Sequence, residues 1–159
     1  MALQKATFGA GDFHAAEHAL GKIPGVVSTR VGYTGGHTRN PTHDEVQTDT
    51  TGHAEAVEVT YDSDAVSYET LLDAFWACHD PTQLNRQGVH VGSQYRSAIF
   101  AHTPEQKAAA ERARKVLAKS GRVTRPVMTE IVQAGEFFPA IDEHQQYFAK
   151  RGVRNPGPE

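Results

Sequence analysis

The spacing of apolar and polar residues alternates between strand-like and helix-like segments. Residues 54–61 read Ala-Glu-Ala-Val-Glu-Val-Thr-Tyr, the two-residue period of a strand with one face toward a core. Residues 67–77 begin Ser-x-x-Thr and place apolar side chains at helical spacing: Leu71, Leu72, Phe75 and Trp76. The same signals predict strands at 6–10, 26–33, 95–101 and 127–132, and helices at 12–22, 104–119 and 142–150. This succession predicts a mixed α/β fold.

Two long polar segments interrupt these elements. Residues 34–51 contain Gly-Gly and Asn-Pro, and residues 79–94 contain Asp-Pro and two further glycines, so both are predicted to be loops. Loops on a rigid frame commonly carry functional side chains, and the chemistry is expected there. No repeat or internal linker is visible, and we expect one domain over residues 1–159, with a core of about residues 4–150 and a Pro/Gly-rich tail at 152–159.

Composition narrows the class of protein. The chain has 159 residues and a formal net charge of −3, which gives no basic surface for nucleic acid. No apolar stretch is long enough for a membrane span, and no leader-like segment is seen, so a cytoplasmic location is expected. Cys78 is the only cysteine, which excludes an internal disulfide and every CxxC motif.

Seven segments carry a family resemblance. They keep one order from about residue 4 to residue 150: Ile-Pro-Gly-Val-Val-Ser-Thr-Arg-Val-Gly-Tyr-Thr-Gly-Gly-His at 23–37, Thr-Gly-His-Ala-Glu-Ala-Val at 51–57, Phe-Trp at 75–76, His-Asp-Pro-Thr at 79–82, Asn-Arg-Gln-Gly at 85–88, Gln-Tyr-Arg-Ser-Ala-Ile at 94–99 and His-Gln-Gln-Tyr at 144–147. The chain thus resembles the A-type peptide methionine sulfoxide reductases. The resemblance implies a two-layer α/β sandwich with a mixed sheet related to the ferredoxin-like plan.

The family's nucleophile is missing at the matching place. Those reductases carry Gly-Cys-Phe-Trp-Gly, whose thiolate attacks the sulfoxide sulfur, whereas residues 11–15 here are Gly-Asp-Phe-His-Ala. Gln47 lies where a resolving cysteine is expected, and Cys78 lies in a helix end that the family does not use for catalysis. Because a carboxylate cannot form a sulfenic acid, we expect no thiol-dependent reduction of methionine sulfoxide and no dependence on thioredoxin.

The residues that replace the family's pocket suggest a metal centre. By resemblance, seven positions line this pocket, and three of them hold histidine: Asp12, Phe13, His14, His43, Glu55, His90 and Tyr95. Three imidazoles around one point would leave open coordination positions, so His14, His43 and His90 are predicted to hold one divalent metal, with Fe(II) favoured over Zn. Asp12 is a further ligand, an acceptor that orients an imidazole, or only a helix cap.

The predicted function is that of a non-haem iron dioxygenase. Its substrates would be O2 and a small sulfur-containing metabolite such as a thiol or thione, with no nucleic acid or membrane as partner. Glu55 and Tyr95 would act in proton transfer and Phe13 would form an apolar wall against the substrate. Two alternatives stay open: a zinc-dependent hydrolase with Glu55 or Asp12 as base, and a non-catalytic relative that binds a metabolite or an oxidised peptide.

Overall fold

A six-stranded mixed sheet forms the frame of the protein. The computed structural model describes residues 1–152. The strands lie in the order β7-β6-β1-β3-β2-β8, with β6 and β7 parallel and the other neighbours antiparallel. Their bounds are β1 Leu3–Ala10, β2 Val26–Thr34, β3 Ala54–Asp62, β6 Ser97–Ala101, β7 Glu130–Gln133 and β8 Phe138–Pro139. A separate two-stranded hairpin joins β4 (Arg86–Gln87) to β5 (His90–Val91).

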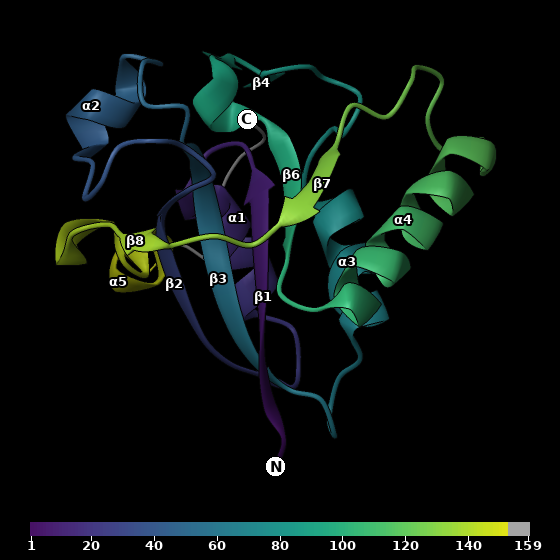
Figure 1. The fold of residues 1–159 in the computed structure, drawn as a ribbon. Helices are drawn as coiled ribbons and strands as arrows, with labels where there is room; N and C mark the ends of the chain where they lie inside the picture. Colours follow the sequence, from purple (N-terminus) through teal and green to yellow (C-terminus); the bar gives the residue numbers. More distant parts are fainter. Residues whose placement is uncertain (153–159) are drawn as a thin grey trace.

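Three helices cover one face of this sheet. They are α1 (Phe13–Gly21), α3 (Tyr68–Ala77) and α4 (Pro104–Lys119), which Figure 1 shows on the same side of the strands. Their apolar faces and the facing strand residues form the main core, in which Leu20, Leu72 and Phe75 are fully buried. The predicted mixed α/β fold with a helical layer on a mixed sheet is therefore confirmed.

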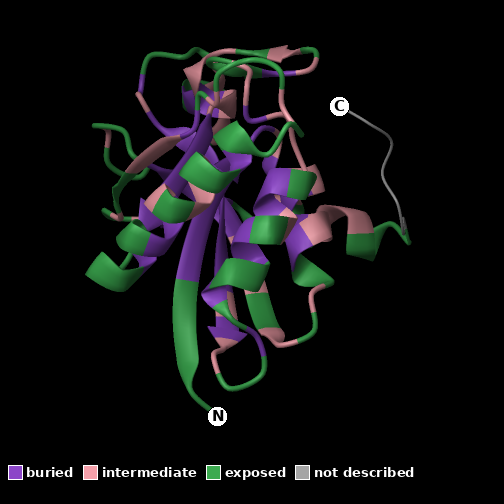
Figure 2. Ribbon diagram, turned by 90° about the vertical axis from the view of Figure 1, so that its right-hand side faces the viewer, coloured by how far each residue is buried: buried purple, intermediate pink, exposed green. Residues whose placement is uncertain are grey.

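The other face of the sheet is covered by chain without helices. Small side chains make this face shallow, because Ala54, Ala56 and Ala98 lie there beside Phe100. The connection from β7 to β8 crosses in front of these strands, and its Phe137 packs on them (Figure 1). The first residues of β1 extend beyond both layers and are exposed, whereas the rest of that strand is buried (Figure 2).

Helix starts follow the capping residues in the sequence. Asp12, Ser67 and Thr103 are the N-caps of α1, α3 and α4, and each side chain accepts a backbone N–H of the first turn. Pro104 opens α4, where its missing N–H costs nothing. The predicted inner face of α3 is confirmed, because its four apolar residues are buried.

The short elements differ from the predictions. The first predicted loop contains a short helix, α2 (His43–Gln47). This helix begins at a capping box formed by Thr42 and Glu45. The second contains the β4–β5 hairpin and the 3-10 turn η1 (Ser93–Tyr95). The predicted helix at 142–150 is broken at Gln146, which has a φ of 48°, into the 3-10 turn η2 (Asp142–His144) and α5 (Tyr147–Lys150). The predicted tail lies mostly outside the described residues, and no helix within residues 1–152 is long and apolar enough to cross a membrane.

Two glutamines fix the segment between η2 and α5 against the body of the protein. Gln145 donates to the carbonyls of Val31 and Ala140 and accepts the N–H of Val31. Gln146 donates from its backbone and its side chain to the carboxylate of Glu17 on α1, at 2.8 and 2.9 Å. These bonds hold the end of η2 beside the start of α1.

Candidate active site

The site begins where β1 ends and α1 starts. Gly11 has a φ of 84°, a left-handed conformation that glycine adopts without strain, and turns the chain into the helix. Asp12 then caps α1, with Oδ1 accepting the N–H of His14 at 2.9 Å. The same oxygen lies 3.3 Å from Nδ1 of the His14 ring. Asp12 is therefore a helix cap and also an acceptor that orients an imidazole, two of the roles expected for it.

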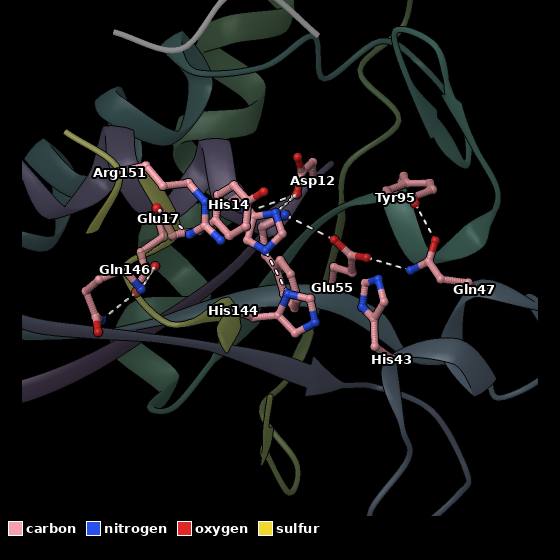
Figure 3. Close-up of polar contacts among 12 residues, drawn as sticks. Asp12, His14, Glu17, His43, Gln47, Glu55, Tyr95, His144, Gln146 and Arg151 are labelled. Carbon is pink, nitrogen blue, oxygen red and sulfur yellow. Dashed lines mark hydrogen bonds and ion pairs between the residues drawn. The ribbon is translucent and has the colours of Figure 1, made fainter. Parts of the chain in front are cut away.

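A buried carboxylate joins three elements of the site. Glu55 on β3 is 2% exposed; its Oε1 accepts the N–H of Phe13 at 3.1 Å and its Oε2 accepts Nε2 of Gln47 at 2.7 Å. Oε1 of Gln47 in turn accepts the hydroxyl of Tyr95 at 2.5 Å, as Figure 3 shows. Burial, with the carboxylates of Glu55 and Asp12 nearby, raises the pKa of Tyr95 to about 12, so its hydroxyl keeps its proton at neutral pH.

Three imidazoles surround the ring of Phe13. They come from α1, α2 and η2: His14, His43 and His144 have ring centres 4.9, 6.0 and 5.6 Å from that of Phe13. Nε2 of His14 and Nδ1 of His144 are hydrogen-bonded at 2.9 Å, and the rings of His144 and His43 lie 4.5 Å apart. Figure 3 shows the ring of His144 between the other two.

The imidazoles of His14 and His43 favour their neutral form. Burial is the largest cause of the lowered pKa of His14, with His144, His43 and Arg151 acting in the same direction and Asp12 opposing. Burial also lowers the pKa of His43, together with His144 and against Asp44 and Asp12. Neutral imidazoles can both accept and donate, so these rings can move a proton.

Tyr33 fixes the ring of His43 in place. Its hydroxyl is hydrogen-bonded to Nδ1 of His43 at 3.1 Å, and burial followed by the charges of Glu55 and Asp44 raises the pKa of Tyr33 far above neutrality. The hydroxyl keeps its proton, so it donates to Nδ1 or accepts from it according to the tautomer of His43.

Most of the predicted pocket residues lie together. The residues that share contacts around Phe13 and Glu55 are Asp12, Phe13, His14, His43, Glu55 and Tyr95. His90 instead packs on the ring of Tyr95, with ring centres 4.9 Å apart. Two residues of the site were not predicted. His144 takes the place expected for His90. Gln47, predicted only as the position of a missing cysteine, bonds to Glu55 and Tyr95. The signal for His144 was present in the His-Gln-Gln-Tyr segment.

The only cysteine lies outside this group of contacts. Cys78 is the C-cap residue of α3, is half-buried, and has Sγ 3.3 Å from the carbonyl oxygen of Phe75. The predicted position at a helix end is confirmed. The sulfur of Cys78 bonds to the backbone of α3 and packs against the main core.

The helical layer on a mixed sheet, with buried Glu55 and half-buried Tyr95 beside the start of α1, is the fold and pocket of the sulfoxide reductase class. The model of the peptide methionine sulfoxide reductase family matches residues 4–155. The chain belongs to this family.

Relatives and solved structures agree with this assignment. The chain is 56% identical over 150 residues to the peptide methionine sulfoxide reductase MsrA of Methanoculleus marisnigri, a match covering 94% of this chain and 92% of the relative. The structure of methionine sulfoxide reductase A from Corynebacterium diphtheriae is similar with a TM-score of 0.83 and 40% identity, over 94% of this chain and 76% of that one. Mxr1 from Saccharomyces cerevisiae in complex with Trx2 matches with a TM-score of 0.62 and 25% identity, over 92% and 85%.

These relatives overturn the predicted activity. The prediction of a dioxygenase acting with O2 on a sulfur metabolite is wrong, because relatives that match nearly the whole chain are named methionine sulfoxide reductases. The same finding contradicts the prediction that the chain is not a thiol-dependent reductase, and it supports neither the zinc hydrolase nor the non-catalytic relative. The prediction followed from the missing nucleophile at position 12, although seven segments along the chain resemble the reductases.

The predicted metal centre is also wrong. Within residues 1–152, no group of three or more His, Cys, Asp and Glu side chains could hold a metal ion. Ring nitrogens of His14 and His43 are hydrogen-bonded to His144 and Tyr33 instead. The ring of His90 packs on that of Tyr95. A divalent cofactor, iron or zinc, is thus contradicted by the family and by the geometry of the donors.

The predicted independence from thioredoxin is contradicted as well. Mxr1, a structural relative of this chain, is described in complex with Trx2. The prediction rested on the missing cysteines at positions 12 and 47. The absence of cysteine at positions 12 and 47 bears on which sulfur attacks the substrate. It does not bear on which protein supplies the electrons.

Proposed function

We propose that this protein reduces methionine sulfoxide in peptides with electrons from a thiol, and that the attacking sulfur comes from the thiol reductant itself. The observation that carries the proposal is the carboxyl of Glu55, which lies buried between Phe13, Gln47 and the Tyr95 hydroxyl behind it. The matched family and its relatives support the substrate class.

The polar groups suit a sulfoxide oxygen. That oxygen is a strong acceptor, and it must gain protons before it leaves sulfur. Glu55, once it takes up a proton, and His43 are the groups beside Phe13 that can pass protons to this oxygen, and Gln47 fixes the orientation of the carboxyl. The ring of Phe13 is fully buried beneath the three imidazoles, so a substrate methyl group would reach it only where those rings move aside.

The residues around Phe13 require an outside thiol. Asp12 caps α1 and is bonded to His14, so its carboxylate serves the helix and the imidazole. The sulfur of Cys78 lies against the last turn of α3, apart from the contacts that join Phe13 and Glu55. A thiolate from a reductant would therefore attack the sulfoxide sulfur, with the oxygen leaving toward Glu55 and His43.

A thioredoxin-like dithiol is the reductant class that we propose. Its first thiol would attack the substrate sulfur and its second would release the product by forming the disulfide. The complex described for Mxr1 supports this class. Dithiols of this class are kept reduced in the cytoplasm, which supports the cytoplasmic location that we propose.

The test is a reductase assay on a peptide that contains methionine sulfoxide. The reductant is either dithiothreitol or thioredoxin with its reductase and NADPH, and the wild type is compared with Glu55→Gln and Cys78→Ser. Wild type and Cys78→Ser are expected to turn over at the same rate. Glu55→Gln keeps a side chain of similar size and is expected to slow turnover by about 100-fold, a usual value for the loss of one acid–base group.

Two outcomes would overturn the proposal. A Cys78→Ser variant without activity would show that the chain's own thiol attacks the substrate. A wild type that binds the oxidised peptide, measured by calorimetry, but reduces it with neither reductant would be a binding protein and not a reductase.

A further inference from the structure

Asp12, His14 and His144 lie in one line of polar contacts. Oδ1 of Asp12 forms an ion-pair contact with Nδ1 of His14 at 3.3 Å, and Nε2 of His14 is hydrogen-bonded to Nδ1 of His144 at 2.9 Å. The carboxylate favours the His14 tautomer with its hydrogen on Nδ1, because an N–H that faces an anion is stabilised. In that tautomer His14 accepts at Nε2 from Nδ1–H of His144, and Nε2 of His144 keeps an unprotonated lone pair.

His144 is accessible from a cavity. It lines a cavity of about 520 Å³ together with His43, Tyr33, Pro41 and Ile141. Its ring is half-buried, between the ring of His14 at 5.1 Å and that of His43 at 4.5 Å. A thiol that enters this cavity can thus meet the imidazoles of His144 and His43.

Neighbouring groups keep His14 neutral and in position. His43 and the guanidinium of Arg151, which lies 3.5 Å over the ring of Tyr147, oppose a positive charge on His14, whereas the carboxylate of Asp12 favours it. The ring of Tyr147 stacks on His14 at 4.2 Å and keeps it in plane. The arrangement resembles a base that is oriented by a second ring and a carboxylate.

We propose that His144 is the base that takes the proton of the attacking thiol, with His14 and Asp12 as positioning residues. This inference rests on the proposed function and adds the group that activates the reductant. A thiol of ordinary acidity is mostly protonated at neutral pH, so a base at the site would speed its attack.

The steps balance with two thiols. The first S–H proton goes to Nε2 of His144, and the thiolate forms an S–S bond to the methionine sulfur while the S–O bond breaks. The oxygen leaves as water with one proton from Glu55 and one from His144. The second thiolate attacks the first thiol sulfur, its proton restores Glu55, and the electron pair of the broken S–S bond returns to the methionine sulfur. One sulfoxide and two thiols give one thioether, one disulfide and one water.

The test compares thiols of different acidity. His144→Gln, Asp12→Asn and the matched control His37→Gln, which replaces an exposed histidine, are assayed at pH 8 with 2-mercaptoethanol and with the more acidic trifluoroethanethiol. His144→Gln is expected to lower kcat/KM for 2-mercaptoethanol by about 100-fold, whereas the loss with the largely ionised thiol is expected to be about fivefold or less. Thioredoxin in a parallel arm distinguishes a protein dithiol from a small one as the preferred source.

Asp12→Asn tests the orientation of the rings. Asparagine is an equally good helix cap but has no charge to share with His14. It is expected to give a smaller loss with the same dependence on thiol acidity. The control is expected to match the wild type with both thiols.

Each other result overturns the inference. An equal loss of kcat/KM with both thiols in His144→Gln would indicate a structural role for His144. No loss of kcat/KM would show that His144 takes no part in the reaction. In both cases turnover by the wild type would leave the proposed function standing. Nitrogen NMR shifts that put the hydrogen of His144 on Nε2 would contradict the inference without any assay. A wild type inactive with every thiol would overturn the proposed function and this inference with it.

Discussion

Acid is expected to destabilise this protein through one buried imidazole, that of His79. Nδ1 of His79 lies 2.7 Å from the carbonyl oxygen of Phe75, and Nε2 lies 2.7 Å from the hydroxyl of Ser97. A carbonyl only accepts, so Nδ1 carries the hydrogen and Nε2 accepts from Ser97. Burial, opposed by the Phe75 carbonyl and Asp80, lowers the pKa of His79 from 6.5 to about 4.

The sign and size of the effect follow from this shift. The folded protein resists protonation of His79, whereas the unfolded chain takes up the proton near pH 6.5. The stabilisation is fully present above the unfolded pKa and is lost as the pH falls toward the folded one. From pH 7 to pH 5 the loss is about 2 kcal/mol, and it approaches about 3 kcal/mol at the folded pKa.

Urea unfolding at a series of pH values measures this loss. The free energy of unfolding is extrapolated to water for the wild type and for His79→Gln, which cannot titrate. His14, His43 and His102, whose pKa values are also lowered, contribute to both proteins and cancel in the difference. The wild type is expected to lose about 2 kcal/mol more than the variant between pH 7 and pH 5. Equal losses would refute the reasoning.

Three further substitutions test the frame by urea unfolding at pH 7. Gly36→Ala is expected to cost about 2 kcal/mol or more, because the added Cβ would lie 2.4 Å from the backbone nitrogen of His53 and 2.5 Å from the carbonyl oxygen of Thr51; an unchanged midpoint would contradict that geometry. Ser67→Ala removes the cap of α3 and is expected to cost about 1 kcal/mol, with Ser67→Asp as the control that retains it. Leu72→Ala, at a fully buried position, is expected to cost about 2–5 kcal/mol, and a cost below that of the cap variant would contradict its place in the core.

Long periodic segments were predictable because several signals agree in them. The helix expected at 104–119 has the same bounds in the structure, since Thr103 caps it and Pro104 opens it. The alternation of residues 54–61 is now β3, which extends one residue further to Asp62. By contrast, α2 has five residues and β4 and β5 have two each, too short for a period to show. The capping pair Thr42 and Glu45 was the one local signal for α2.

The site was predictable only where the family resemblance placed residues. Asp12, His14 and Glu55 came from matching segments, and they do lie together. His144 pairs with His14 across 130 positions, and nothing local announces such a contact. By the resemblance, a histidine at position 144 is ordinary for the family, so it indicated no special role. The histidine at position 14, its partner, departs from the family and was noticed for that reason. The error about the metal had the same origin, since clustered imidazoles were expected to share an ion and instead bond to each other.

The hydrogen bonds from Gln146 to Glu17 can form only late in the synthesis of the chain. Glu17 is nearly buried in α1, and two of its bonds come from a residue made 129 positions later. On the ribosome, α1 and the sheet emerge long before that residue, so the nascent chain carries a carboxylate whose pairing is incomplete and an imidazole at position 14 without its neighbour. A fragment that stops before residue 142 would keep Asp12, His14 and Glu55 but lack these contacts. The segment from residue 142 therefore completes the pocket. The full set of contacts around His14 and Glu17 forms only after translation has passed this segment.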